Sequence, residues 1–155
     1  MQQNGSVREL NEEETAYLNY WRITFSNMIP DQQRSMLDTT DGKLEFIQQI
    51  LNSGQATVER PDLLQGLGVM FGDALAAELD LKWAALDDGD DPIPVVIRPG
   101  TSFRAGALFA IEKRVRNDEV PIDARALFGG FCAVANDALR PKKSLWGRLF
   151  GSRLV

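Results

Sequence analysis

Apolar residues recur at every third or fourth position in five stretches of the chain, and this spacing predicts five amphipathic helices. We expect these helices at about residues 11–30, 44–54, 61–79, 104–116 and 123–139. A further, short helix is an option at residues 31–37. Pro30 and Gly54 support the ends of the first two helices, because proline and glycine disfavour continuation of a helix.

The first helix has a strong start signal and an aromatic face. Asn11 is placed to cap the helix, and Glu14 occupies the capping-box position. The face that we expect to point into the core consists of Tyr17, Tyr20, Trp21, Thr24, Phe25 and Met28. A ligand platform would show the same residues, but we favour a plain core face.

The helix at 61–79 is apolar on nearly every face, which is typical of a central, buried helix. It contains Gly66, Gly68 and Gly72, each of which lowers helix stability by up to about 1 kcal/mol relative to alanine. We expect these glycines where another element packs closely against the helix. Asp73 lies in the same apolar segment, so its carboxylate, if buried, needs a hydrogen bond or a cation. We expect structural pairing, and a functional role stays open.

Two short stretches change from helical spacing to the pattern of strands. Residues 81–86 and 93–98 predict an antiparallel hairpin across an Asp- and Gly-rich turn at 87–92. Pro94 cannot donate a ladder hydrogen bond, so it belongs at a strand start or a sheet edge. Residues 120–122 could add an edge strand. The predicted fold class is α+β, with about five α-helices packed on a small antiparallel β-hairpin or three-stranded sheet in a single domain.

The distribution of charge divides the chain into a body and a tail. The 155 residues carry a formal net charge of −5, but residues 140–155 hold five basic side chains and no acid. Residues 1–139 therefore hold 12 basic and 22 acidic side chains. Such a body repels nucleic acid, because phosphates are bound by clusters of Lys and Arg. We expect a flexible N-terminus at residues 1–10, a globular domain at 11–139 and a basic amphipathic tail at 140–155.

The tail carries large apolar side chains at helical spacing among its basic ones. The side chains that define its surface are Lys142, Lys143, Trp146, Arg148 and Phe150. We expect the apolar ones to fold back onto the acidic body. Binding to a partner or a second copy is the first alternative that the pattern leaves open, and contact with a membrane surface is the less favoured one.

Missing residue types exclude several kinds of chemistry. The chain has no histidine and a single cysteine, Cys132. A Ser-His-Asp triad, a disulfide within the chain and a zinc cluster of cysteines and histidines are therefore excluded. We predict no enzyme activity, no metal and no cofactor. An enzyme that relies on carboxylates is the least favoured function.

The expected compartment follows from the first residues and the apolar runs. Residues 1–6 are polar and lack the basic and apolar regions of a signal peptide. No run approaches the roughly 18 apolar residues of a membrane-spanning helix. A lone cysteine suits a reducing compartment. We therefore expect a cytoplasmic protein.

Two groups of residues are candidates for a binding site. The turn of the hairpin carries Asp87, Asp88, Asp90 and Asp91, a candidate surface for a basic protein partner. Their spacing is not that of a calcium loop, so a solvated turn is the simpler interpretation. The second group is a possible pocket, or a structural polar cluster, and consists of Asp73, Trp83, Arg98, Lys113 and Arg114.

Residues 64–139 resemble a bacterial family known as domain of unknown function 3806. The matching pieces are Leu67-Gly68-x-x-Phe71-Gly72-Asp73, Leu81-x-Trp83, the hairpin with its acidic turn, Ile111-x-Lys113-Arg114 and Asp123-x-x-x-Leu127-Phe128. They cover about half of the chain and leave out the segment before Leu64 and the basic tail. The resemblance implies a shared α+β domain and no particular activity.

The function that we favour from the sequence is a non-enzymatic protein-binding module. An immunity protein, which neutralises a cognate bacterial toxin by direct binding, fits a single acidic domain with an acidic turn. A basic toxin such as a nuclease is the expected partner, because opposite charge speeds association. The alternative is a small-ligand or peptide-binding domain that uses the candidate pocket. The oligomeric state and the identity of the partner stay open.

Overall fold

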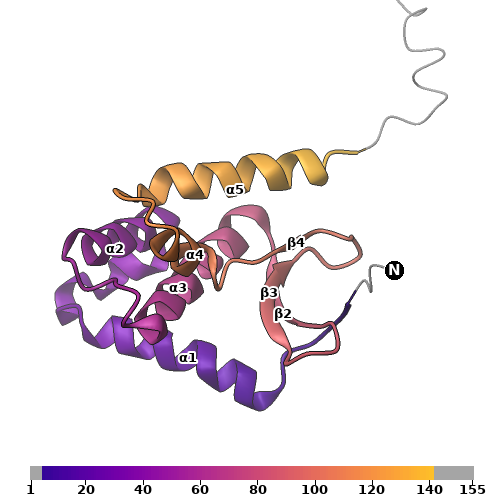
Figure 1. The fold of residues 1–155 in the computed structure, drawn as a ribbon, viewed down its shortest axis with the longest axis horizontal. Coiled ribbons are helices and arrows are strands. Elements are labelled where there is room, and N and C mark those ends of the chain that lie inside the picture. The colour runs from indigo at the N-terminus through magenta and orange to yellow at the C-terminus, as the bar shows by residue number, and fades with distance from the viewer. Residues whose placement is uncertain (1–4, 142–155) are drawn as a thin grey trace, which may run out of the picture.

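A single four-stranded antiparallel sheet packs against a group of helices in the computed structural model, which describes residues 5–141 (Figure 1). The strands are β1 (Ser6–Arg8), β2 (Lys82–Asp87), β3 (Ile93–Ile97) and β4 (Arg104–Ala105), in the order β1-β2-β3-β4. The helices are α1 (Glu12–Asn27), the 3-10 helix η1 (Asp31–Asp38), α2 (Thr40–Asn52), α3 (Pro61–Leu79), α4 (Ala110–Arg116) and α5 (Ala124–Ala138). The predicted α+β class is confirmed, with one strand more than expected.

The predicted hairpin is present, and its register explains how Pro94 is accommodated. β2 and β3 pair with Trp83 opposite Val96 and Ala85 opposite Pro94. β4 pairs with β3 only through the opposite end of that strand, at Val96 and Ile97. Pro94 therefore lies beyond the part of β3 that pairs with β4, where a missing N–H donor costs no ladder hydrogen bond on that side.

Helix α3 is the centre of the molecule, with the other helices around it and the sheet at one end (Figure 1). Eleven of its residues are buried, as its apolar composition predicts. A Cβ added at Gly66 or Gly72 would lie 2.4 or 2.1 Å from the rings of Trp21 and Trp83. The expectation that the glycines of this helix allow close packing is therefore confirmed.

The start of α1 is as predicted, but its buried face is narrower. The Glu14 amide donates to the Asn11 side chain, and the Glu14 carboxylate accepts from the Asn11 amide, both at 2.8 Å. Only Leu18, Trp21 and Phe25 of this helix are buried. The predicted inner face is wrong at two positions, since Tyr20 is 59% exposed and Met28 is 49% exposed. The helix packs on one side only, mainly against α3, so a single stripe suffices.

Residues 1–10 were predicted to be a flexible N-terminus, and the structure corrects this for residues 6–8. They form β1, in which Val7 lies opposite Leu86 of β2. Three residues between polar neighbours carry too little alternation to predict a strand. Pairing with the exposed edge of β2, which lies far away in sequence, supplies the ladder hydrogen bonds that the local pattern does not reveal.

The predicted fourth helix at 104–116 is wrong in its first half. Arg104 and Ala105 form β4, and the helix begins only at Ala110. Leu108 is buried without being helical, because its backbone packs against Gly68 of α3. Burial against a neighbouring helix therefore accounts for the apolar spacing that indicated a longer helix. Residues 120–122 form no strand, although Ile122 is buried.

Candidate functional site

The acidic turn projects from the end of the sheet between β2 and β3. Asp88, Asp90 and Asp91 are exposed, and Asp87, the last residue of β2, is half-buried. Gly89 takes the left-handed conformation, with φ of 104°, that lets the chain reverse here. Within residues 5–141 none of the four carboxylates forms an ion pair. The turn therefore presents concentrated negative charge to the solvent.

One arginine lies near the base of this turn, but another acid already binds it. Arg8 of β1 makes two hydrogen bonds to the carboxylate of Glu14, at 2.7 and 3.0 Å. Hydrogen bonding to Arg8 holds the pKa of Glu14 below its usual range. The pKa of Arg8 is raised chiefly by Glu14, and Asp87 adds a smaller electrostatic contribution. Arg8 therefore compensates the turn only in part, at Asp87.

Asp73 is held in a closed polar cluster. Arg22 of α1 donates from Nε and Nη2 to the two carboxylate oxygens at 2.8 and 2.7 Å, and Trp83 donates from Nε1 at 2.9 Å. This bidentate pair raises the pKa of Arg22. The prediction that Asp73 pairs with a cation is confirmed. The cation is Arg22, 51 residues away in sequence, which the spacing of the chain did not indicate.

The remaining members of the predicted pocket make no hydrogen bond to Asp73 or Trp83 within residues 5–141. Arg98 donates to the main-chain carbonyl of Leu79. Arg114, on α4, donates to Glu119 at 2.8 Å, and Lys113 is exposed. The structure brings Asp73 and Trp83 together but does not bring the five residues to one cavity. The Trp83 ring packs closely against α3 at Gly72, where an added Cβ would lie 2.1 Å from it.

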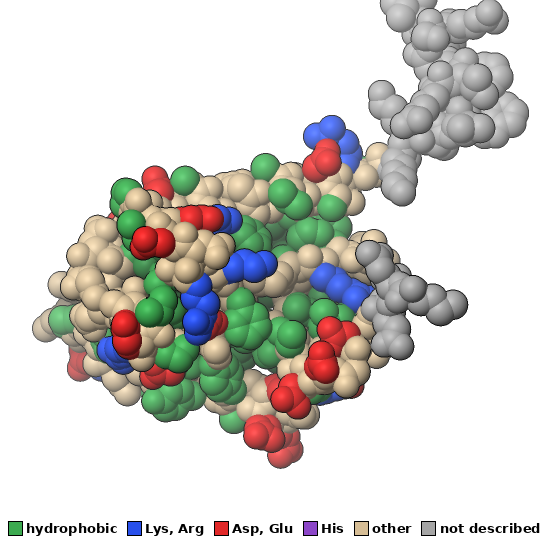
Figure 2. All heavy atoms as spheres, in the orientation of Figure 1, with side chains coloured by type: hydrophobic (Ala, Val, Ile, Leu, Met, Phe, Trp, Pro, Cys, Tyr) green, Lys and Arg blue, Asp and Glu red, His purple; other side chains and the backbone are tan. Residues whose placement is uncertain are grey.

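A cavity lies beneath α5 and is lined by residues of α5, of β4 and of the segment before α5; we call it the α5 groove. It has a volume of about 930 Å³. Its walls are Phe103, Arg104, Ala105, Arg114, Asp118, Glu119, Val120, Pro121, Ile122, Asp123, Ala126, Leu127, Gly130, Phe131 and Val134. This volume is in the range of pockets that hold small molecules or several side chains of a peptide. Figure 2 shows hydrophobic side chains on this face of the molecule directly beneath α5.

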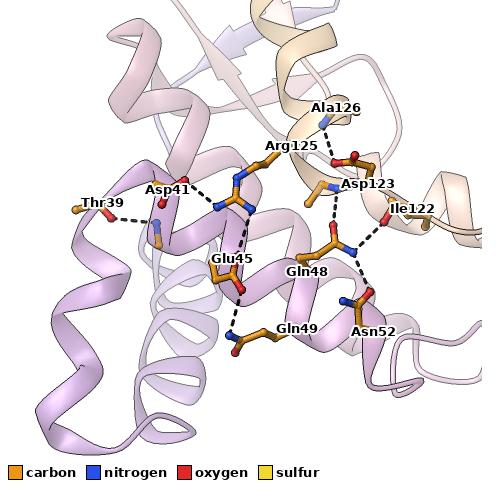
Figure 3. A network of polar contacts seen from close by, with 12 residues as sticks. Thr39, Asp41, Glu45, Gln48, Gln49, Asn52, Ile122, Asp123, Arg125 and Ala126 are labelled. Carbon is orange, nitrogen blue, oxygen red and sulfur yellow. Dashed lines mark hydrogen bonds and ion pairs between the residues drawn. The ribbon is translucent and has the colours of Figure 1, made fainter.

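A polar network fixes the start of α5 and thereby one wall of the groove (Figure 3). The side chain of Gln48, on α2, accepts from the Ala124 amide at 2.9 Å and donates to the Ile122 carbonyl at 3.1 Å. Asp123 caps α5 by accepting from the Ala126 amide at 3.0 Å. These contacts link residues more than seventy positions apart and hold the segment before α5 in place.

A second network on the same side of α5 consists of ion pairs. Arg125 donates to Asp41 at 2.8 Å and to Glu45 at 3.2 Å, both on α2 (Figure 3). These pairs are largely exposed, so each adds little to stability. They nevertheless orient the first turn of α5 against α2, which leaves the opposite side of the helix facing the groove.

The apolar residues of α5 differ in how far they are buried, and this difference leaves the groove beside the helix. Leu127 and Ala135 are buried, but Val134, seven residues after Leu127 and so on nearly the same side of the helix, is 67% exposed. Phe131 is half-buried, with its ring centroid 5.2 Å from that of Phe71 in an edge-on contact. The apolar residues of α5 therefore cover two surfaces, one towards α3 and one towards the groove. That surplus of apolar positions is the signal by which the sequence could have indicated a groove.

The single cysteine lies on α5 but has no activated thiol. Cys132 is half-buried, and burial raises the pKa of its thiol, with a smaller contribution from Glu78. A raised pKa lowers the population of the reactive thiolate. Within residues 5–141 no group of three His, Cys, Asp or Glu residues is placed to hold a metal ion. Over the same residues no helix has the length and apolar character needed to cross a membrane.

The predicted tail surface lies outside the described residues, which end at Pro141. Its residues are Lys142, Lys143, Trp146, Arg148 and Phe150.

Comparisons with known proteins place the fold but not an activity. No match is found among curated proteins. A crystal structure of a protein from Bacteroides thetaiotaomicron VPI-5482 is similar to this chain, with a TM-score of 0.61 and 17% identity. The similarity covers 82% of this chain and 47% of the other, so the chain spans about half the length of that protein. At this identity the likeness shows the fold alone.

The family resemblance is confirmed, with different boundaries from those expected. The family described as domain of unknown function (DUF3806) matches residues 43–127, more than half of the 155 residues. The match begins in α2, before the expected start at Leu64, and ends early in α5, before the expected end at Leu139. It contains the central helix and the hairpin with its acidic turn. It also contains twelve of the fifteen residues that line the α5 groove, all those up to Leu127. The chain therefore belongs to the family of domain of unknown function 3806.

Proposed function

We propose that this chain is a non-enzymatic protein-binding module that presents its acidic β2–β3 turn to a basic protein partner. The partner class that we propose is a cognate bacterial toxin, such as a nuclease, which the chain neutralises by direct binding as an immunity protein. We place this binding in the cytoplasm, because the lone cysteine suits a reducing compartment.

The observation that carries the proposal is the uncompensated charge of the turn. Asp88, Asp90 and Asp91 are exposed at the end of the sheet, and within residues 5–141 no cation pairs with them. Exposed charge of one sign speeds the approach of an oppositely charged protein by about tenfold or more at low salt. A basic toxin that binds phosphates has the complementary surface.

The test is to remove the charge of the turn without changing its length. The triple variant Asp88→Asn, Asp90→Asn, Asp91→Asn should associate at least about tenfold more slowly at low salt with a basic toxin encoded beside this chain. The difference should shrink at high salt, because salt screens exposed charges. Protection of growing cells against that toxin should weaken in parallel.

A matched control removes three exposed acids elsewhere. The variant Asp38→Asn, Asp62→Asn, Glu78→Gln changes the net charge by the same amount away from the turn. If both triple variants slow association equally, only the overall charge matters and the turn is not the binding surface. If the wild-type chain does not bind the toxin encoded beside it, the proposed immunity function is refuted.

Peptide binding in the α5 groove is a second candidate function, favoured by the size and lining of that cavity. Nine of its fifteen lining residues are apolar, and five are charged. This composition is typical of sites that bury apolar side chains and orient them with a few polar groups. The corresponding hypothesis from the sequence named a different location, around Asp73 and Trp83, where the Trp83 ring lies against Gly72 and its indole N–H donates to Asp73.

A further inference from the structure

The α5 groove exposes apolar side chains that two different elements supply. Val120, in the segment before α5, is 72% exposed, and Val134, on α5, is 67% exposed. They are the two most exposed large hydrophobic residues in the part of the chain that the structure describes, and both line this groove. Apolar surface gathered in one concave place is typical of a site that another segment covers.

Charged residues line this groove together with apolar ones, which we call its apolar floor. Three of the charged residues are acids, which we call its acidic rim, and two are arginines, Arg104 and Arg114. Asp118, Glu119 and Asp123 come from the segment between α4 and α5. Arg114 pairs with Glu119, whereas Asp118 forms no ion pair within residues 5–141. An occupant with apolar side chains and positive charge would match both the apolar floor and the carboxylate of Asp118.

The chain itself contains a segment with this composition directly after α5. Residues 142–155 include Leu145, Trp146, Leu149 and Phe150 together with four basic side chains and no acid. Pro141 separates the segment from α5, and proline disfavours continuation of a helix through the residue before it. The segment therefore follows a position, just after the end of α5 at Ala138, where continuation of the helix is disfavoured.

The length of the segment is sufficient to reach along the groove. The walls that α5 contributes run from Ala126 to Val134, and Val134 lies seven residues before Pro141. At 1.5 Å per helical residue, these walls are about 10–22 Å from Pro141 along the helix. An extended chain advances about 3.3 Å per residue, so Trp146 reaches about 17 Å and Phe150 about 30 Å. Both aromatic side chains can therefore reach the groove when the segment runs back antiparallel to α5.

We propose that residues 142–155 bind in the α5 groove of the same chain, with their aromatic side chains on the apolar floor and their basic side chains towards the acidic rim. This inference rests on the second proposed function, that the groove binds apolar, basic peptide segments. A segment tethered this close has an effective concentration on the order of millimolar, which favours the chain's own tail over a free peptide of the same sequence. An external peptide binds only by displacing it.

Disulfide trapping in the full chain tests the position of the tail. In a Cys132→Ser background, Val134→Cys is combined with Leu149→Cys, and the control combines Ala133→Cys with the same tail cysteine. Ala133 is exposed and next to Val134 on α5, but it does not line the groove. We expect an intramolecular disulfide that forms at least about tenfold faster in the Val134→Cys chain, because the tether alone brings the tail equally close to both positions and only binding in the groove favours Val134.

Each other result of this trapping overturns the proposal. Equal rates in the two chains would mean that the tail has no preferred site. A disulfide that forms only between chains, seen as a covalent dimer, would assign the groove to the tail of a second copy.

A peptide measurement separates this inference from the function on which it rests. The probe is a fluorescein-labelled peptide of residues 142–155, added to the full wild-type chain and to a full chain carrying Trp146→Ala and Phe150→Ala. We expect at least about tenfold tighter binding to the tail variant, in which the competing tail is weakened. Equal binding to both chains would overturn tail binding in cis and leave peptide binding intact. Absence of binding to either chain would overturn both the binding of the tail and the proposal that the groove binds peptides.

Two adjacent glycines show whether the peptide occupies the groove. Gly130 lines the groove and Gly129 does not, and a Cβ at either position meets no atom within 4 Å. In the tail variant, Gly130→Leu should weaken peptide binding at least about tenfold, whereas Gly129→Leu should leave it unchanged. An equal effect of the two substitutions would place the peptide outside the groove and overturn the proposal.

Discussion

The sharpest stability prediction concerns two helical glycines that differ only in what surrounds them. A Cβ at Gly68 of α3 would lie 1.9 Å from the main-chain oxygen of Leu108, whereas a Cβ at Gly129 of α5 would meet nothing within 4 Å. The same substitution to alanine should therefore destabilise the protein at the first position and stabilise it at the second.

The magnitude at Gly68 follows from this overlap. Ordinary van der Waals contact begins at 3.4 Å, so α3 and the segment before α4 must separate by more than an ångström. Overpacking of this kind costs about 1–3 kcal/mol, occasionally more, and here the obstacle is backbone rather than a flexible side chain. The gain in helix propensity returns up to about 1 kcal/mol. We expect a net loss of about 2 kcal/mol, equivalent to a Tm lower by about 4–8 °C in a chain of this size.

At Gly129 only the gain in helix propensity remains. Alanine at this exposed position should raise the free energy of unfolding by about 0.5–1 kcal/mol. Urea unfolding followed by circular dichroism measures both variants, with equal m-values showing that the unfolded states are comparable. A Gly68→Ala chain as stable as the wild type would refute the close packing of α3 against Leu108.

Three further predictions concern polar contacts. Gln48→Ala should lower the free energy of unfolding by about 1–3 kcal/mol, because two hydrogen bonds to the start of α5 are lost. An unchanged midpoint of urea unfolding would contradict the role of this network. Asp73→Asn should lower the free energy of unfolding by about 1–2 kcal/mol in the same assay, because the guanidinium of Arg22 loses its bidentate, charged partner. The loss is limited because the Arg22 side chain is 37% exposed and can bind water instead. The pKa of Glu14 is lower in the folded chain than in the unfolded one, so the stability that its ion pair with Arg8 supplies is present near neutral pH and lost as the pH falls through the folded pKa. The difference in unfolding free energy between the wild type and Glu14→Gln should therefore shrink from about pH 7 to about pH 3, and a constant difference would exclude this linkage.

Local features of the sequence were predicted correctly because their causes lie within a few residues. The cap of α1 at Asn11 and Glu14, the burial of α3 and the hairpin with its acidic turn all depend on neighbouring side chains. The glycines of α3 also signalled close packing, since nothing else compensates their cost in a helix.

Errors arose where one pattern fits two environments. Ala107 and Leu108 are spaced for the buried face of a helix, yet they are buried in a loop against α3. Val134 is spaced for the core but lies in the α5 groove. Periodicity reports which positions avoid water, and it does not report whether a helix, a loop or a groove covers them.

The sequence by itself determined the α+β class, most element boundaries, the acidic character of the body and the position of the charged turn, because composition and short-range periodicity carry that information. Only the tertiary structure decided which groups meet: Arg22 with Asp73, Gln48 with the start of α5, and β1 with β2. These partners are about fifty or more residues apart, and no spacing along one chain encodes their approach. The α5 groove belongs to the same class, since a cavity exists only between elements that the fold has already placed together.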